Sequence, residues 1–89
     1  MQGNETYLNH PTFGLLFRIC SVGEGQELFT TLYAQRLFFV VAQGTVGVDF
    51  EPLGRSEARL MVENRLRQLR RTGVNAEYKA LDVIYRQTF

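Results

Sequence analysis

The sequence has little of the chemistry that most enzymes and metalloproteins use. Among its 89 residues there is one cysteine, Cys20, and one histidine, His10. A single cysteine excludes an internal disulfide framework and any zinc or iron–sulfur site built from several cysteines. A single histidine excludes metal motifs that pair two histidines. We therefore expect neither a metal nor a cofactor.

Long hydrophobic runs are also missing. No stretch approaches the roughly 18 apolar residues of a membrane-spanning helix, and residues 1–10 lack the basic and then apolar pattern of a signal peptide. Hydrophobic residues nevertheless make up 45% of the chain and charged residues 21%, which is typical of a folded domain. These features predict one small, soluble, cytoplasmic protein.

The charges are unevenly distributed, although the formal net charge is only +1. Residues 1–54 carry five acids and two bases, a net charge of −3, whereas residues 55–89 carry eight bases and four acids, a net charge of +4. Opposite charges of this size favour electrostatic docking between the two parts, which salt would weaken.

The hydrophobic period changes at the same boundary. Up to residue 54, short apolar runs alternate with glycine-containing breaks, which is typical of hairpins. The predicted strands are 15–20, 27–33, 36–43 and 45–51, with a short strand at 6–8 before the bend at His10 and Pro11. Five short antiparallel strands favour a small, twisted barrel.

Residues 55–89 instead have helical spacing. Ser56 is the predicted N-cap of a first helix, which Gly73 ends, and Asn75 is the predicted N-cap of a second. The expected apolar faces are Ala58, Met61, Val62, Leu66 and Leu69, then Tyr78, Leu81, Ile84 or Tyr85, and Phe89. The chain therefore has an expected α+β organisation, with a barrel at 1–54 and a two-helix hairpin at 55–89 packed on or beside it.

Few side chains are candidates for catalysis. The spacing of Cys20 and His10 does not exclude a nucleophile and base pair, but a packed thiol and a turn histidine that caps backbone groups are favoured, because reactive thiols lie in exposed, electropositive places. Asp49 and Glu51 share a strand face, either as paired carboxylates or as a solvated face. The glycines match no phosphate-binding loop. We predict that the protein is not an enzyme.

Binding is better supported than catalysis. Residues 36–42 are apolar on both faces of the predicted strand. Only one face can point into the interior of a small barrel, so helices or another protein must cover the other face. The preceding turn carries Tyr33 and Arg36, residue types enriched at interface hot spots. Alternatively, Tyr33 packs at the barrel rim and Arg36 is a solvated turn charge.

An arginine-rich helix face is a second candidate surface. Helical spacing places Arg67, Arg70 and Arg71 on one side, suited to nucleic-acid phosphates or to an acidic protein surface. The alternative is a solvated helix face with ion pairs to Glu63. A nucleic-acid-binding barrel that uses this helix is therefore a second functional hypothesis.

Three segments closely resemble the PipX family, the PII-interacting proteins of cyanobacteria. They are YLNHPTFGLL at 7–16, FTTLYAQRLFF at 29–39 and NRLRQLRR at 64–71, and the resemblance covers essentially the whole chain. It implies a Tudor-like (SH3-like) barrel followed by helices, acting as a non-enzymatic adaptor in nitrogen regulation.

The resemblance also implies the partners. When 2-oxoglutarate is scarce, the T-loops of the trimeric PII signalling protein would bind the barrel. When 2-oxoglutarate is abundant, the barrel would bind the dimeric transcription activator NtcA as a coactivator, through an overlapping surface. The helices would repack on PII binding and contact further regulators or RNA polymerase, and no direct binding of DNA or of a small molecule is implied.

The residues implied to contact these partners are spread along the first half of the chain. They are Glu5, Tyr7, Glu24, Tyr33, Gln35, Arg36, Leu37 and Phe39. The arginine-rich helix face, with Arg67, Arg70 and Arg71, is a candidate secondary surface that rests on helical spacing.

Overall fold

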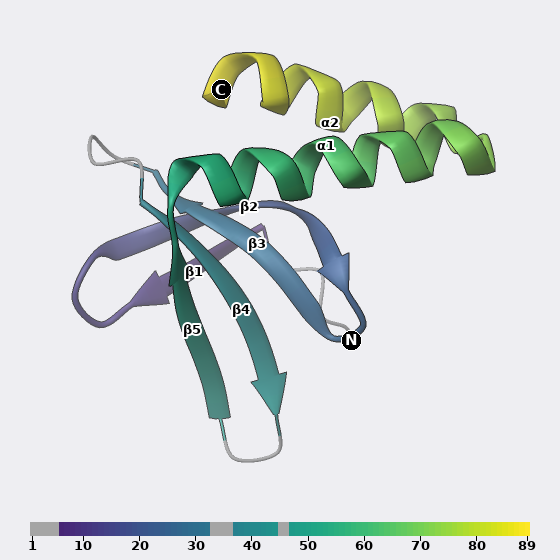
Figure 1. The fold of residues 1–89 in the computed structure, drawn as a ribbon. Helices are drawn as coiled ribbons and strands as arrows, with labels where there is room; N and C mark the ends of the chain where they lie inside the picture. The colour runs from purple at the N-terminus through teal and green to yellow at the C-terminus, as the bar shows by residue number, and fades with distance from the viewer. Residues whose placement is uncertain (1–5, 33–36, 45–46) are drawn as a thin grey trace.

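The fold is a five-stranded antiparallel sheet followed by two helices, an α+β arrangement, as a computed structural model that describes residues 6–32, 37–44 and 47–89 shows (Figure 1). The strands are β1 (Tyr7–His10), β2 (Gly14–Gly23), β3 (Gln26–Thr31), β4 (Phe38–Gly44) and β5 (Gly47–Leu53), and the helices are α1 (Arg55–Thr72) and α2 (Asn75–Thr88). The predicted fold, a small five-stranded antiparallel barrel with a helical hairpin, is confirmed.

The sheet is a simple meander in which each strand pairs with the next, in the order β1-β2-β3-β4-β5. Irregularities in the pairing of β2 with β3 lie between Arg18 and Cys20 and between Ser21 and Gly23. Such bulges bend and twist a strand, so β2 curls across the sheet. The result is a half-barrel in which His10 of β1 reaches Phe50 of β5, with ring centroids 4.7 Å apart.

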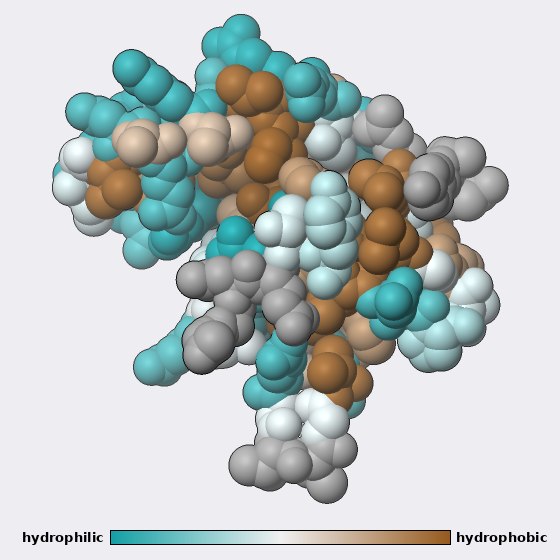
Figure 2. All heavy atoms as spheres, turned by 180° about the vertical axis from the view of Figure 1, so that it is seen from behind, coloured by the Kyte–Doolittle hydropathy of each residue, from teal (hydrophilic) through white to brown (hydrophobic). Residues whose placement is uncertain are grey.

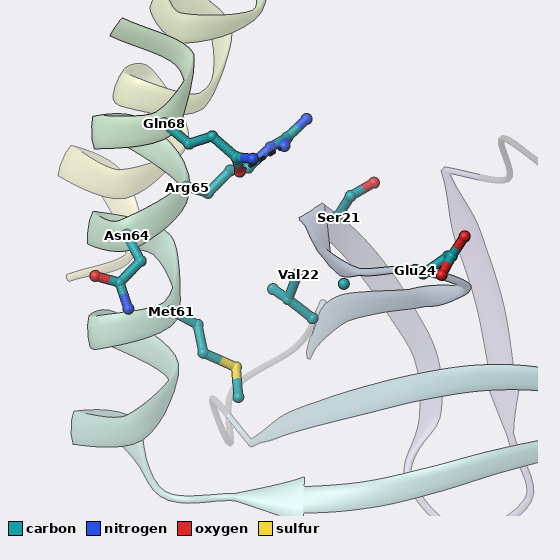
Figure 3. A pocket seen from close by; sticks show the side chains of 8 residues that line it. Ser21, Val22, Glu24, Met61, Asn64, Arg65 and Gln68 are labelled. Carbon is teal, nitrogen blue, oxygen red and sulfur yellow. Dashed lines mark hydrogen bonds between the residues drawn. The ribbon is translucent and has the colours of Figure 1, made fainter. Parts of the chain in front are cut away.

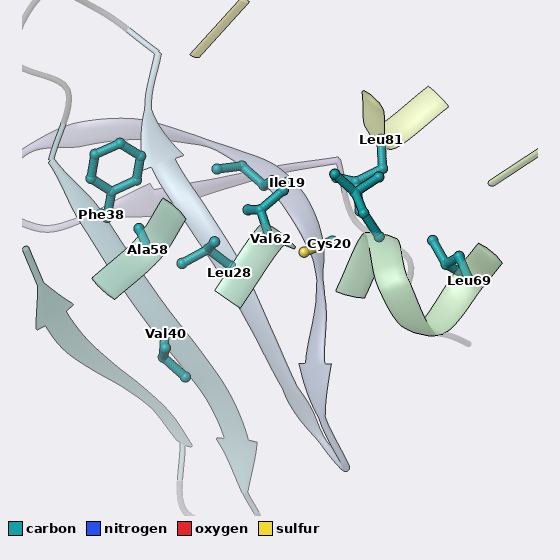
Figure 4. Close-up of a cluster of buried hydrophobic side chains, with 10 residues drawn as sticks. Ile19, Cys20, Leu28, Phe38, Val40, Ala58, Val62, Leu69 and Leu81 are labelled. Carbon is teal, nitrogen blue, oxygen red and sulfur yellow. The ribbon is translucent and has the colours of Figure 1, made fainter. Parts of the chain in front are cut away.

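The two faces of the sheet bury different clusters of side chains. The helices cover one face, where Leu28, Phe38 and Val40 meet Val62 and Leu81 (Figure 4). Its other buried members are Ile19, Cys20, Ala58, Leu66 and Leu69. The second cluster lies inside the curl of the sheet and consists of Leu16, Phe29, Phe39 and Val41.

These clusters explain the apolar run in β4. Phe38 and Val40 face the helices, whereas Phe39 and Val41 face the inside of the half-barrel. Because side chains alternate along a strand, both faces of positions 38–41 are filled within the molecule. The hypothesis that a partner covers the second face of this strand is therefore wrong for these positions, and the helices cover it.

The helix ends partly correct the predicted caps. Gly54, not Ser56, is the N-cap of α1, and its N–H donates to Glu57 Oε1 at 3.2 Å. Strand β5 continues to Leu53, so the chain turns directly into the helix at Gly54. Gly73 ends α1 as predicted, in the left-handed region with φ of 78°. Val74 precedes α2, so Asn75 is its first residue rather than its N-cap.

The interface between sheet and helices is apolar, contrary to the expected electrostatic docking. Among the residues that the structure describes, each of the four ion pairs joins two strands or lies within the helical hairpin. Arg18 pairs with Glu27 across the sheet, and Arg65 pairs with Glu77 between the antiparallel helices. The buried apolar cluster instead holds the hairpin against the sheet. Phe89 extends this cluster, because its ring stacks on that of Phe38 with the centroids 5.3 Å apart.

Candidate protein interaction surface

Cys20 and His10 lie on opposite faces of the sheet. Cys20 is 4% exposed in the cluster under the helices, and burial raises the pKa of its thiol to about 11. The His10 ring stacks on Phe39 inside the half-barrel, and its Nδ1 accepts hydrogen bonds from the backbone N–H groups of Thr12 and Phe13 at 3.0 and 3.2 Å. The packed thiol and the turn histidine are confirmed, and the nucleophile–base pair is wrong.

The other candidate chemical groups lie at the surface. Asp49 and Glu51 are both exposed on the edge strand β5, in agreement with a solvated face. Within residues 6–32, 37–44 and 47–89, no three histidine, cysteine, aspartate or glutamate side chains lie close enough to hold a metal ion. No helix in the described part of the chain is long and apolar enough to cross a membrane.

The residues implied to contact partners have different exposures. Tyr7 is 50% exposed on the edge strand β1, and Leu37 is half-buried immediately before β4. Phe39 is 3% exposed and belongs to the cluster inside the half-barrel. Glu5, Tyr33, Gln35 and Arg36 lie outside the described residues.

The residues on either side of positions 33–36 are joined to one another by a short network of hydrogen bonds. The backbone N–H of Thr31 donates to the carbonyl of Leu37 at 3.0 Å, and the N–H of Leu37 donates back to Thr31 Oγ1 at 3.0 Å. The hydroxyl of Thr30 donates to the same Leu37 carbonyl at 2.9 Å. Both threonines are buried, so the positions where the chain leaves β3 and enters β4 are fixed by the fold.

An aromatic pocket of about 380 Å³ lies beside this network. It is lined by His10, Phe13, Leu37, Phe38, Phe39, Phe50, Pro52 and Leu53. Phe13 is 47% exposed, and its ring centroid is 5.7 Å from that of Phe39. Sequence reasoning did not single out Phe13 or Phe50, because only the curling of the sheet brings β1 and β5 together.

Exposed hydrophobic side chains are present on several elements. The face opposite to that of Figure 1 shows a broken band of hydrophobic side chains running from the helices onto the sheet, with hydrophilic side chains around it (Figure 2). The most exposed large hydrophobic residues of the described chain are Tyr7, Phe13, Leu32, Val48, Leu60, Val74 and Val83.

Glu24 lies several residues beyond the part of β2 that pairs with Tyr7. Tyr7 pairs with Phe17, whereas Glu24 follows the end of β2 at Gly23, six residues further along, which corresponds to about 20 Å in a strand. Glu24 borders a groove of about 380 Å³ between α1 and the turn that joins β2 to β3 (Figure 3). The groove is lined by Ser21, Val22, Gly23, Glu24, Met61, Asn64, Arg65 and Gln68.

The arginine-rich face of α1 is exposed, but it does not pair with Glu63 as expected. Arg67 donates to Asn64, and the guanidinium of Arg70 lies over the Tyr78 ring, 5.4 Å from its centroid. Glu63 instead accepts hydrogen bonds from the Tyr85 hydroxyl and from Arg59, and the first of these does most to lower its pKa.

Comparison with known proteins supports the resemblance seen in the sequence. No curated protein matches the chain. A family model described as PipX, PII-interacting protein X, matches residues 4–89, which include every strand and both helices. This chain therefore belongs to the PipX family of PII-interacting proteins.

Proposed function

We propose that this protein is a non-enzymatic adaptor in nitrogen regulation with two alternative partners. It binds the PII signalling protein when 2-oxoglutarate is scarce, and it acts as a coactivator of NtcA when 2-oxoglutarate is abundant. The observation that carries the proposal is the match of residues 4–89 to a family of PII-interacting proteins.

The proposed shared surface lies at the end of the sheet where β3 passes into β4. Its members would be the exposed Tyr7 and the half-buried Leu37, together with Glu5, Tyr33, Gln35 and Arg36, which lie outside the described residues. The fixed hydrogen bonds between Thr31 and Leu37 support this proposal, because a rigid base reduces the entropy lost on binding. If both partners use these residues, the two complexes exclude one another.

Two further groups of residues complete the proposal. Phe39 would act indirectly: its ring is buried, so it would hold β4 in place rather than contact a partner. Glu24 would contact a part of the partner that reaches the far end of β2. Arg67, Arg70 and Arg71 would form a secondary surface for further transcription regulators or RNA polymerase.

The experiment is a pull-down of purified PII, first with ADP and then with ATP and 2-oxoglutarate. Strong binding is expected only with ADP, and NtcA is expected to show the opposite dependence on 2-oxoglutarate. Equal binding of PII under both conditions would contradict the adaptor proposal.

Variants test the surface separately. Arg36→Ala is expected to weaken PII binding by about 2 kcal/mol or more, as for an interface hot spot, and Tyr33→Ala to weaken NtcA binding. Lys79→Ala, an exposed change on α2, is the matched control. Affinities like those of the unchanged protein for both test variants would show that the surface is wrongly placed.

A further inference from the structure

We infer that the groove between α1 and the β2–β3 turn binds an acidic protein segment. The segment would carry carboxylates and at least one large apolar side chain. This inference does not rest on the proposed nitrogen-regulation function, because the groove is built mainly from α1 and the end of β2 rather than from the residues around Thr31 and Leu37.

The groove has an apolar floor and a polar wall. Val22 and Met61 point toward one another at its base, and both pack against the buried cluster under the helices (Figure 3). Arg65 and Gln68 extend from α1 toward Ser21 on the opposite side. A volume of about 380 Å³ is enough for one or two large side chains of a partner.

The guanidinium of Arg65 is held in place at this wall. Its Nη1 donates to Gln68 Oε1 at 3.0 Å, and its Nη2 donates to Glu77 Oε2 at 2.9 Å. Its Nε is buried and has no hydrogen-bond partner among the residues that the structure describes. A partner can therefore reach only the outer edge of this guanidinium, which is 23% exposed, and because the group is already held by Gln68 and Glu77 it loses little side-chain entropy on binding.

Positive charge continues along the same helix beyond the groove. Arg67 and Arg71 are exposed, and Arg67 donates to Asn64, which lines the groove. The nearby acids of the two helices are already engaged, since Glu63 accepts from Tyr85 and Arg59, and Glu77 accepts from Arg65, whereas Glu24 is exposed on the opposite wall. Because Arg65 is itself paired with Glu77, the positive charge that attracts an anionic partner to the α1 side of the groove comes from Arg67 and Arg71, neither of which belongs to an ion pair of the described residues.

Two features favour a protein segment over a nucleic acid. An apolar floor beside arginines is typical of protein interfaces, in which apolar side chains and arginine are enriched. Glu24 also stands on the wall opposite α1 and is exposed. A nucleic acid, with a regular row of phosphates, would bring negative charge against Glu24, whereas a peptide can place its carboxylates on the arginine side alone.

The test is fluorescence anisotropy with a labelled peptide of alternating glutamate and leucine at low salt. Binding is expected to weaken by about tenfold or more with Arg67→Glu, because a like charge then faces the peptide. The matched control is Arg86→Glu on α2, which makes the same change of charge at a side chain that is 77% exposed, and it is expected to shift affinity by less than about twofold. A second peptide with glutamine in place of glutamate is expected not to bind.

Amide NMR locates the peptide. On titration, shifts are expected at the side-chain amides of Asn64 and Gln68 and at Gly23, and not at Thr31 or Leu37. Equal weakening by Arg67→Glu and Arg86→Glu, shifts confined to Thr31 and Leu37, or tighter binding of a mixed oligonucleotide pool would each overturn the inference. PII binding by Arg67→Glu is measured in parallel, so that failure of the groove and failure of the adaptor proposal are distinguished.

Discussion

At the scale of single residues, burial separates side chains that the sequence alone places in one class. Tyr7 and Phe39 are both aromatic residues on strands and both resemble family contact residues, yet they are 50% and 3% exposed. Their substitution therefore tests different properties, binding for Tyr7 and folding for Phe39.

Phe39→Ala is expected to lower the free energy of unfolding by about 3–5 kcal/mol, because it leaves a cavity among Leu16, Phe29 and Val41. Tyr7→Ala is expected to lower it by less than about 1 kcal/mol. Urea denaturation followed by circular dichroism measures both. Equal losses would mean that the Phe39 ring is not packed inside the half-barrel.

Cys20 gives a second residue-scale prediction, on pH dependence. Its folded pKa of about 11 lies above the ordinary value of 9.0, mainly because burial disfavours the thiolate. The stability that this thiol contributes is complete below pH 9, where both states are protonated, and is lost as the pH rises through 11.

Urea denaturation at several pH values from 8 to 11 is the measurement, with Cys20→Ala as the control. The loss of stability with rising pH is expected to be steeper for the unchanged protein than for Cys20→Ala. Cys20 is also expected to react with iodoacetamide only after unfolding. Identical pH slopes, or rapid alkylation of the folded protein, would contradict the burial of this thiol.

At the scale of elements, backbone geometry at the glycines decides where helices end. Gly73 has φ of 78°, and its N–H donates to the carbonyl of Arg70 at 3.3 Å. A Cβ added at Gly73 would meet no atom within 4 Å, so any cost of a side chain there comes from the backbone conformation alone.

Gly73→Ala is expected to destabilise the protein by about 1–2 kcal/mol, because a residue with a Cβ is strained in the left-handed region. Gly44→Ala is the matched control, since its nearest neighbour would be the Gly47 carbonyl at an ordinary 3.9 Å. Thermal unfolding of both variants is the measurement. If both variants unfold at the same temperature, the turn between the helices does not depend on this conformation.

The two helices show which local sequence patterns are sufficient to predict their structure. Helical spacing alone identifies both apolar faces of the hairpin, because each face packs against one partner and repeats over several turns. The caps at Ser56 and Asn75 are misplaced because a cap depends on where the preceding strand or turn ends. In this chain β5 continues to Leu53 through Pro52, which an edge strand tolerates.

At the scale of the whole molecule, the sheet and the helices share one buried cluster although their net charges are opposite. The described ion pairs stay within the sheet or within the hairpin, so screening them removes little of the attachment between the two parts.

Raising NaCl from about 0.05 to 1 M is therefore expected to lower the midpoint of thermal unfolding by less than about 4 °C, which corresponds to less than about 1 kcal/mol. Calorimetry at both salt concentrations is the measurement. A larger fall, or a separate transition for the helices at high salt, would restore the electrostatic account of their docking.

The sequence by itself determined the α+β order of elements, the absence of a multi-cysteine or paired-histidine site, and the family to which the chain belongs. These properties depend on residue types, local period and motifs along the chain. Only the tertiary structure decided which of the described aromatic residues in the strands are buried and where, since two sequence-adjacent rings, Phe38 and Phe39, pack into different clusters. It also brings Arg65 of α1 to Val22 of β2, because a groove between distant segments exists only once the helices lie on the sheet.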